Sequence, residues 1–81
     1  MKVQVRLFAA LREATGTTHV VQELPPGAKV QYLMDSLARQ YPALRSQISF
    51  VRTAVNRQYA SPQTELCDGD EVALVPPVGG G

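Results

Sequence analysis

The first segment with a clear hydrophobic pattern is a strand. Val3, Val5 and Leu7 alternate with polar residues over positions 2–7, and a period of two is typical of a strand with one buried face. Phe8 breaks the alternation, because it falls on the polar face. Two interpretations of Phe8 stay open: it packs beneath the next segment, or it contacts a partner protein.

A short helix and a second strand are predicted next. Residues 9–14 contain good helix formers and no helix breaker, and Gly16 suits the left-handed position that commonly follows a helix. Residues 17–24 are rich in β-branched side chains, which favours a strand. The link at residues 14–16 is too short for a parallel crossover, so we expect these two strands to be antiparallel.

The longest regular pattern predicts an amphipathic helix. A Pro-Pro-Gly run at residues 25–27 stops the second strand, and Pro42 marks the end of the helix. Apolar residues recur between them at spacings of three and four: Val30, Leu33, Met34, Leu37, Ala38 and Tyr41. We interpret this stripe as the face that packs on the core, and we assign no cofactor to it.

The second half of the chain predicts further strands. Residues 43–49 form a connector without a clear pattern. Residues 50–56 predict a strand, and after a turn residues 59–60 predict a short return strand. A tight acidic turn at residues 68–70 then leads to a last strand over residues 72–75.

The order of these elements predicts an α+β domain. A chain of 81 residues is too short for two domains of ordinary size, so residues 1–81 are expected to form one domain. We expect a sheet of four to five strands with the long helix packed on one face. Residues 76–81 follow the last strand as an extended, flexible tail.

Composition and charge narrow the classes of partner. The net charge is +1 and the basic residues are scattered, which argues against nucleic acid. No apolar run approaches the roughly 20 residues of a membrane helix, and residues 1–11 lack the order of a signal peptide. A single cysteine, Cys67, excludes an internal disulfide framework and favours a reducing compartment. We therefore expect a cytoplasmic protein that binds neither nucleic acid nor membrane.

Few side chains offer chemistry of their own. His19 is the single histidine, and without a cluster of Cys and His it cannot form a metal site, so no metal is expected. Cys67 stands beside Asp68, an anion that disfavours the nucleophilic thiolate, and we interpret it as a half-buried packing residue. The carboxylates around residues 65–71 are expected to cap backbone amides or to face solvent.

The C-terminal residues are the exception. A Pro-Pro-Val run at residues 76–78 ends the last strand, and Gly79, Gly80 and Gly81 follow. Glycine has no Cβ, so such a tail can enter a channel too narrow for side chains. It would bring the α-carboxylate of Gly81, the one reactive group that it offers, to an active site on another protein.

The last strand and the tail resemble a known protein family. The sequence Asp-Gly-Asp-Glu-Val-Ala-Leu-Val-Pro-Pro-Val over residues 68–78, followed by Gly80 and Gly81, resembles the C-terminal signature of the small, sulfur-carrier subunit of molybdopterin synthase. Residues 7–16, the long helix and residues 54–56 resemble that family as well, so the likeness covers nearly the whole chain. Gly79 is a departure, because the family commonly has Ser, Thr or Ala at this position.

This resemblance implies a β-grasp, ubiquitin-like fold and a role in molybdenum cofactor biosynthesis. In the family, an ATP-dependent, E1-like adenylyltransferase activates the terminal carboxylate, here that of Gly81. A sulfur donor, such as a cysteine desulfurase or a rhodanese-like protein, then converts it to a thiocarboxylate. The tail enters the large subunit, where sulfur passes to cyclic pyranopterin monophosphate.

The same resemblance implies that this chain is a non-catalytic subunit. The catalytic residues lie on the large subunit, and the family's synthase is a heterotetramer of two small and two large subunits. No cofactor is implied for the small subunit itself, since ATP is used by the activating enzyme.

Apolar residues beside the tail are candidates for contact with the large subunit, because a buried apolar centre usually supplies the binding energy of an interface. These candidates are Phe8, Val75, Pro76, Pro77 and Val78. Gly79 and Gly80 are expected to thread the partner's active site. Val72 and Leu74 are expected to belong mainly to the core.

Three other functions are compatible with such a tail. A sulfur carrier for thiazole synthesis in the thiamine pathway shares the fold, the diglycine and the activation step, but those carriers lack the Pro-Pro-Val approach. A ubiquitin-like modifier would use the same activated tail to form isopeptide bonds with lysines. A plain interaction domain would carry an inert tail.

Overall fold

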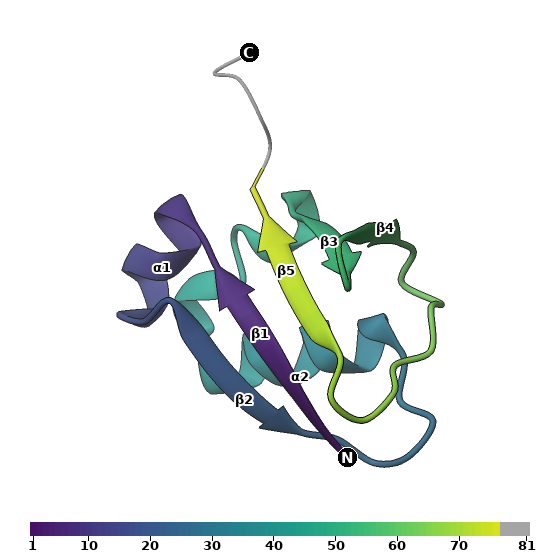
Figure 1. Cartoon of the computed structure of the whole chain (residues 1–81). Helices are drawn as coiled ribbons and strands as arrows, with labels where there is room; N and C mark the ends of the chain where they lie inside the picture. Colours follow the sequence, from purple (N-terminus) through teal and green to yellow (C-terminus); the bar gives the residue numbers. More distant parts are fainter. Residues whose placement is uncertain (77–81) are drawn as a thin grey trace.

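Five strands form one mixed sheet in the computed structural model, which describes residues 1–76. The strands are β1 (Lys2–Leu7), β2 (His19–Glu23), β3 (Arg52–Val55), β4 (Gln58–Ala60) and β5 (Glu71–Val75). Their order in the sheet is β2-β1-β5-β3-β4 (Figure 1). β1 and β5 run parallel, whereas the other neighbours are antiparallel. The last strand therefore lies at the centre of the sheet.

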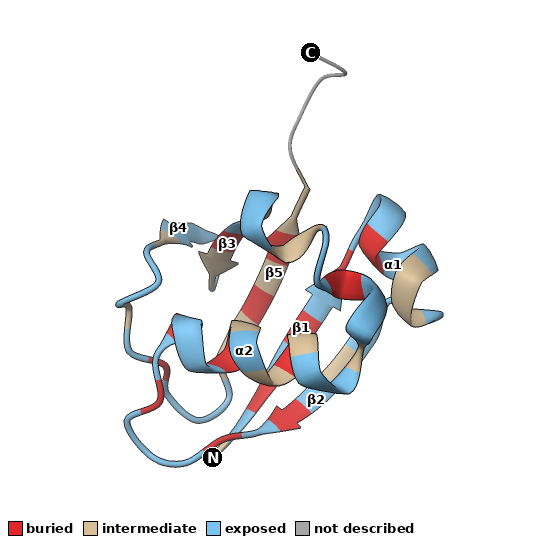
Figure 2. Cartoon of the chain, turned by 180° about the vertical axis from the view of Figure 1, so that it is seen from behind, coloured by how far each residue is buried: buried red, intermediate tan, exposed pale blue. Residues whose placement is uncertain are grey.

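Two α-helices and two short 3-10 helices complete the described chain. They are α1 (Ala9–Thr15), α2 (Val30–Gln40), η1 (Pro42–Leu44) and η2 (Ile48–Phe50). The prediction of one long helix packed on one face of the sheet is confirmed, and Figure 2 shows α2 across that face. The strand predicted from Phe50 begins two residues later, because the Phe50 N–H closes a 3-10 turn onto the carbonyl of Gln47 at 3.0 Å.

The connection from α1 to β2 follows the sequence prediction. Gly16 adopts φ 76, and its N–H donates to the Arg12 carbonyl at 2.8 Å, which ends the helix. β1 and β2 then form the expected antiparallel pair, with Val5 opposite Val20. β2 is shorter than predicted, although Leu24 still bonds to the backbone of Met1.

The core lies between the sheet and α2. Alternate residues of β1 and β5 contribute one face of it, and α2 contributes its apolar stripe (Figure 2). Val72 and Leu74 have no exposed surface, which confirms that they belong to the core. The buried apolar residues are Val3, Val5, Leu7, Leu11, Leu24, Ala28, Val30, Leu33, Leu37, Leu44, Leu66, Val72 and Leu74.

Carboxylates of the acidic turn before β5 cap backbone amides, as predicted. Asp68 Oδ1 accepts a hydrogen bond from the Lys2 N–H at 2.8 Å, and Asp70 Oδ2 accepts one from the Cys67 N–H at 2.8 Å. The interpretation of Cys67 as a half-buried packing residue is wrong, because its side chain is exposed. The preceding residue, Leu66, takes the buried position instead.

The turn between β3 and β4 holds two residues in the left-handed region. Asn56 has φ 50 and Arg57 has φ 72. The Asn56 side chain is anchored, since its Nδ2 donates to Asp70 at 2.9 Å and its Oδ1 accepts from the Glu71 N–H at 3.0 Å. The Arg57 side chain makes no hydrogen bond with another residue of the described range. No such bond therefore offsets the cost of its left-handed backbone conformation.

Replacing Arg57 with glycine is expected to stabilise the protein. Two-residue hairpin turns of this type favour glycine at the second position, and a left-handed conformation costs a residue with a Cβ about 1–2 kcal/mol. Part of this gain is lost to the greater freedom of glycine in the unfolded chain. We expect Arg57→Gly to raise the free energy of unfolding by about 0.5–1 kcal/mol, measured by urea titration. The matched control is Gln58→Gly in β4, which should lower stability; a fall in both variants would contradict this account.

Candidate functional site

The candidate site is the end of the sheet at which β5 finishes. β1 and β5 are parallel with Leu7 opposite Leu74, so the next residues, Phe8 and Val75, lie at the same end of the sheet. Val75 and Pro76 are half-buried, and 40% of Phe8 is exposed. The structure thus places three of the predicted contact residues at one end of the sheet, the end at which the arrows of β1 and β5 finish in Figure 1. Pro77, Val78, Gly79, Gly80 and Gly81 lie outside the described residues.

The face of the sheet that points away from α2 carries arginine and aromatic side chains near this end. The Arg6 guanidinium lies 5.6 Å from the centre of the Phe8 ring, and its Nη1 lies 3.8 Å from Glu71 Oε1. On the other side of β5, the Arg52 guanidinium lies 5.8 Å from the centre of the Tyr59 ring. Contacts of this kind hold the flat faces of aromatic rings and arginine groups together. The face therefore offers both apolar surface and cations to a partner.

Small side chains occupy the centre of the same face. Ala54 of β3 lies opposite Ala73 of β5 in the ladder, and both are half-buried. In the same register Arg52 lies opposite Val75. The next residue of β5 on this face after Ala73 is therefore Val75, at the apolar end of the strand. A partner can approach the backbone closely here, since nothing larger than a methyl group projects from either alanine.

A cleft beside the end of β5 adds residues that the sequence did not single out. It has a volume of about 250 Å³ and lies between α1, η2 and the end of β5. Its lining residues are Ala10, Ser46, Gln47, Phe50, Val51 and Pro76. Phe50 is 68% exposed, so a large apolar ring stands in solvent close to the start of the tail. The one signal in the sequence is a large apolar residue directly after the unpatterned connector, and the strand predicted over residues 50–56 includes it.

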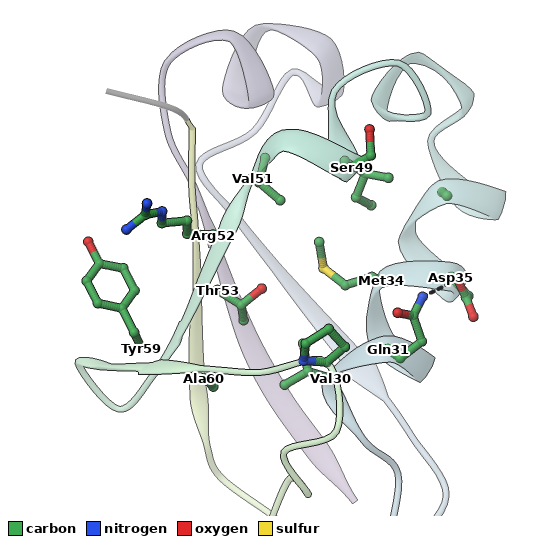
Figure 3. Close-up of a pocket in the computed structure, with 13 residues that line it drawn as sticks. Val30, Gln31, Met34, Asp35, Ser49, Val51, Arg52, Thr53, Tyr59 and Ala60 are labelled. Carbon is green, nitrogen blue, oxygen red and sulfur yellow. Dashed lines mark hydrogen bonds between the residues drawn. The ribbon is translucent and has the colours of Figure 1, made fainter. Parts of the chain in front are cut away.

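A second hollow lies between α2 and the β3–β4 hairpin. Figure 3 shows Met34 of α2 on one side of it and Thr53 of β3 on the other. Its volume is about 570 Å³. It is also absent from the sequence prediction, because it depends on how distant segments pack.

The other residues considered as sources of chemistry do not adjoin the end of β5. His19, the first residue of β2, lies opposite Arg6 of β1, so it is at the same end of the sheet but two strands away from β5. It is exposed, with its Nδ1 3.3 Å from the Thr18 hydroxyl. Cys67 lies in the loop before β5. Within residues 1–76, no three or more His, Cys, Asp or Glu side chains form a group suited to a metal ion. No helix in this part of the chain is long and apolar enough to cross a membrane.

Comparison with known proteins matches both the sequence and the architecture. The model of the ThiS family matches residues 5–81. The molybdopterin synthase sulfur carrier subunit of Mycobacterium tuberculosis is 44% identical, and the match covers 100% of this chain and 99% of that protein. Small archaeal modifier protein 1 of Haloferax volcanii is 32% identical over 94% of this chain and 97% of its own length.

Solved structures agree with these matches. A putative molybdopterin converting factor subunit 1 from Pyrococcus furiosus superposes with a TM-score of 0.89 at 34% identity, covering 96% of this chain and 99% of that one. SAMP1 from Haloferax volcanii superposes with a TM-score of 0.91 at 30% identity over the whole of both chains. A ubiquitin from Caldiarchaeum subterraneum, 17% identical with a TM-score of 0.66 and coverage of 100% and 98%, shares the fold. The β-grasp, ubiquitin-like fold is confirmed, and the chain belongs to the ThiS family, together with the molybdopterin synthase sulfur carrier subunits.

Proposed function

We propose that this chain carries sulfur for molybdopterin synthase on the C-terminal carboxylate of Gly81. The observation that carries the proposal is the sequence that follows the central strand: β5 ends at Val75, two prolines follow, and the chain finishes in glycines without side chains. Full-length similarity to sulfur carrier subunits of molybdopterin synthase supports the same role.

The chemistry begins with activation of the carboxylate, which is a poor electrophile because its oxygen is a poor leaving group. An E1-like adenylyltransferase joins the Gly81 carboxylate to the α-phosphate of ATP and releases pyrophosphate. The terminal sulfur of a persulfide on a sulfur donor, such as a cysteine desulfurase or a rhodanese-like protein, then attacks the acyl adenylate and displaces AMP, which leaves an acyl disulfide. A second thiol attacks the donor's sulfur in this acyl disulfide, forms a new disulfide with it and releases the carrier. The product is a thiocarboxylate, and this chain needs no bound cofactor for either step. Both steps are proposed to take place in the cytoplasm.

Attachment to a folded protein gives the sulfur two advantages. The thiocarboxylate is a soft anionic nucleophile, and docking of the carrier holds it near its acceptor at a high effective concentration. The folded surface also selects the recipient. The proposed recipient is the large catalytic subunit of the synthase, which binds cyclic pyranopterin monophosphate and supplies the acid–base groups. Two such transfers build the dithiolene of molybdopterin.

The docking surface proposed for the large subunit is the end of the sheet around β5. Phe8, Val75 and Pro76 supply apolar contacts there, and Pro77 and Val78 continue them along the chain. Gly79 and Gly80 lead the carboxylate into the partner, and the terminal diglycine, which has no Cβ, passes the narrowest part of the channel there. The exposed Phe50 extends this apolar surface on the side of η2.

Truncating Phe8 is expected to weaken binding of the large subunit. An aromatic side chain at the centre of an interface commonly contributes 2 kcal/mol or more, so Phe8→Ala should raise the dissociation constant by at least about tenfold. Isothermal titration with the purified large subunit measures this change. The control is Tyr32→Ala, which removes an aromatic ring that is 45% exposed on α2, away from β5. Equal affinities for Phe8→Ala and the wild type would remove Phe8 from the interface.

The experiment that tests the function is reconstitution from purified parts. The thiocarboxylated chain is mixed with the large subunit and cyclic pyranopterin monophosphate, and molybdopterin is quantified by fluorescence after oxidation. We expect product to form with about two carriers consumed for each molecule, since each carrier delivers one sulfur. Formation of thiazole phosphate with thiamine-pathway enzymes, and no molybdopterin, would assign the chain to the thiamine pathway instead.

A second candidate function is protein modification, favoured by the 32% identity with small archaeal modifier protein 1. The same activated Gly81 would then form an isopeptide bond with a lysine amine of a target, releasing AMP. An N-terminally tagged chain expressed in its native host would show a ladder of larger conjugates on an immunoblot. The ladder should vanish when Gly81 is deleted; its absence in the wild type would exclude this second role in that host.

A further inference from the structure

The hollow between α2 and the β3–β4 hairpin, called the α2 groove below, has the size of a ligand site. Its volume of about 570 Å³ falls within the range of about 300–1,000 Å³ that is usual for ligand pockets. Val30, Met34 and Ala60 make much of its wall apolar. Pro76, from which the tail continues, lines the other cleft and not this groove. A ligand in the α2 groove would therefore not depend on the tail.

The α2 groove exists because the chain leaves the sheet after β4. The Pro62 carbonyl accepts a hydrogen bond from the Gln31 N–H at 3.0 Å, and the Thr64 carbonyl accepts one from the Val30 N–H at 2.9 Å. These bonds satisfy amides at the start of α2, which would otherwise lack partners. The course of residues 61–64 is thus fixed by the helix, and Pro62 becomes part of the groove wall.

A hydroxyl group without a protein partner faces the groove from the sheet. Figure 3 shows the Thr53 side chain on the groove side of β3, across from Met34. Thr53 is only 7% exposed, and its hydroxyl makes no hydrogen bond with another residue of the described range. In that range every fully buried polar side-chain atom has a partner, so the Thr53 oxygen keeps some surface open to the groove. Hydroxyl groups at such depth are nearly always hydrogen-bonded, so this one offers a donor and an acceptor to a ligand.

A carboxylate without a counterion lines the helix side of the groove. Asp35 is exposed, and its Oδ1 accepts a hydrogen bond from Gln31 Nε2 at 2.9 Å. No basic side chain of residues 1–76 forms an ion pair with it. Arg52 also lines the groove, but its guanidinium lies 5.8 Å from the centre of the Tyr59 ring, and Figure 3 shows both groups on the far side of β3. The charge that the groove offers to a ligand is therefore negative.

We propose that the α2 groove binds a small primary amine whose apolar body carries a hydroxyl group at the far end. The apolar body fills the space between Met34 and Thr53, and its burial supplies most of the affinity. The ammonium group stays at the exposed edge beside Asp35, because an ammonium ion is costly to remove from water. The ligand hydroxyl lies at the inner end and exchanges a hydrogen bond with the Thr53 hydroxyl. An acid of the same shape would place a second carboxylate beside Asp35, so the site selects against anions.

Tyramine has this pattern and serves as the probe in a titration of the full-length, ¹⁵N-labelled chain followed by NMR. We expect saturable amide shifts centred on Met34, Asp35 and Thr53. The dissociation constant should be about 1–10 mM, as suits a ligand of about ten non-hydrogen atoms. Phenethylamine lacks the hydroxyl group and should bind about three- to tenfold more weakly. The acid 3-(4-hydroxyphenyl)propionate has a carboxylate in place of the amine and should bind at least about fivefold more weakly.

The contact with the hydroxyl group is tested by Thr53→Val, which keeps the shape of the side chain. This variant should bind tyramine and phenethylamine with equal affinity, because it has no hydroxyl to tell them apart. The control is Thr18→Val, which removes an exposed hydroxyl group just before β2, at the opposite edge of the sheet. The control should keep the wild-type preference for tyramine.

The contact with the ammonium group is tested by Asp35→Asn, which removes the charge and keeps the size of the side chain. It should weaken tyramine binding about two- to fivefold, the range expected for an exposed ion pair, and should narrow the difference between tyramine and the acid. The control is Glu13→Gln, which removes an exposed carboxylate from α1, outside the groove. It should leave both affinities unchanged.

The place of binding is tested by filling the groove. Ala38→Trp puts an indole into it, whereas Ala43→Trp puts the same group on exposed η1 outside it. We expect the first to weaken tyramine binding at least about tenfold and the second to leave it unchanged. Asp35→Asn changes an exposed side chain, so it tests the site even where Ala38→Trp disturbs the fold.

Three outcomes would overturn the proposal. The first is no saturable shift at tyramine concentrations up to about 50 mM. The second is equal binding of tyramine and the acid by the wild-type chain, which would leave the Asp35 charge without a role. The third is a shift of the same amides with protein concentration in the absence of ligand, which would make a second copy of this chain the occupant.

Discussion

Deleting Gly81 is expected to abolish sulfur transfer while leaving the fold intact. The deletion withdraws the terminal carboxylate by about 3.5 Å along an extended chain. A misplacement of about 1 Å at a reacting centre already costs about a hundredfold in rate. The large subunit should therefore receive sulfur at least about a hundredfold more slowly, measured as molybdopterin formed by the reconstituted synthase. Far-ultraviolet circular dichroism of the variant should match the wild type, because β5 ends at Val75.

The matched control for this deletion changes the tail without shortening it. Gly79→Ser adds one side chain at a position where this chain departs from the family resemblance, and it leaves the terminal diglycine in place. This variant should keep most of the wild-type activity. If the Gly81 deletion and Gly79→Ser behaved alike, the position of the carboxylate would not be the determining feature, and the carrier function would need another explanation.

Truncating Leu33 is expected to have the largest effect on stability. Leu33 lies on the apolar stripe, three residues after the start of α2, and has no exposed surface. Leu→Ala changes at such sites cost about 2–5 kcal/mol, because they lose transfer free energy and leave a cavity. Small domains have total stabilities of about 5–15 kcal/mol, so Leu33→Ala should lower the free energy of unfolding by a large fraction. Urea titration followed by circular dichroism measures this change.

Tyr32 provides the control on the same helix. It is adjacent to Leu33 in sequence but is 45% exposed, and surface substitutions usually change stability by no more than about 0.5 kcal/mol. Tyr32→Ala should therefore unfold close to the wild-type midpoint. Similar losses in the two variants would show that the helix is not packed through the predicted stripe.

The parts of the fold that depend on local pattern were predictable. The alternation ending at Leu7 predicts β1, the stripe through Leu33 and Leu37 predicts α2, and Gly16 marks the end of α1. Each of these signals arises from neighbours within one or two turns of chain, which a single sequence displays directly. The parallel pairing of β1 with β5 carries no such signal, because it joins segments more than sixty residues apart.

The connector after α2 shows why other parts were missed. Its two 3-10 helices are each three residues long, too short to produce a detectable period. The sequence therefore predicts a strand that includes Phe50, whereas in the structure Phe50 belongs to η2 and is exposed beside Pro76. Cys67 was expected to be half-buried, but Leu66 occupies that position. A shift of one residue reverses which side chain faces the core.

The candidate site likewise has a part that the sequence indicates and a part that it does not. The chemistry of the tail could be inferred from the sequence, where it stays a prediction, because it resides in consecutive residues, Gly80 and Gly81 above all. The groove beside Thr53 could not, because it exists only where the chain leaves the sheet after Ala60 to cap α2. Its walls come from α2, η2 and the β3–β4 hairpin, which no pattern links in the sequence.

The most direct test of the carrier function is the mass of the chain after loading. The full-length protein is incubated with its E1-like enzyme, ATP and a sulfur donor, and the intact mass is measured together with the C-terminal fragment. We predict an increase equal to the replacement of one oxygen by one sulfur, located at Gly81 and absent when ATP is omitted. An unchanged mass under conditions that load a known carrier, or sulfur located on Cys67, would contradict the account.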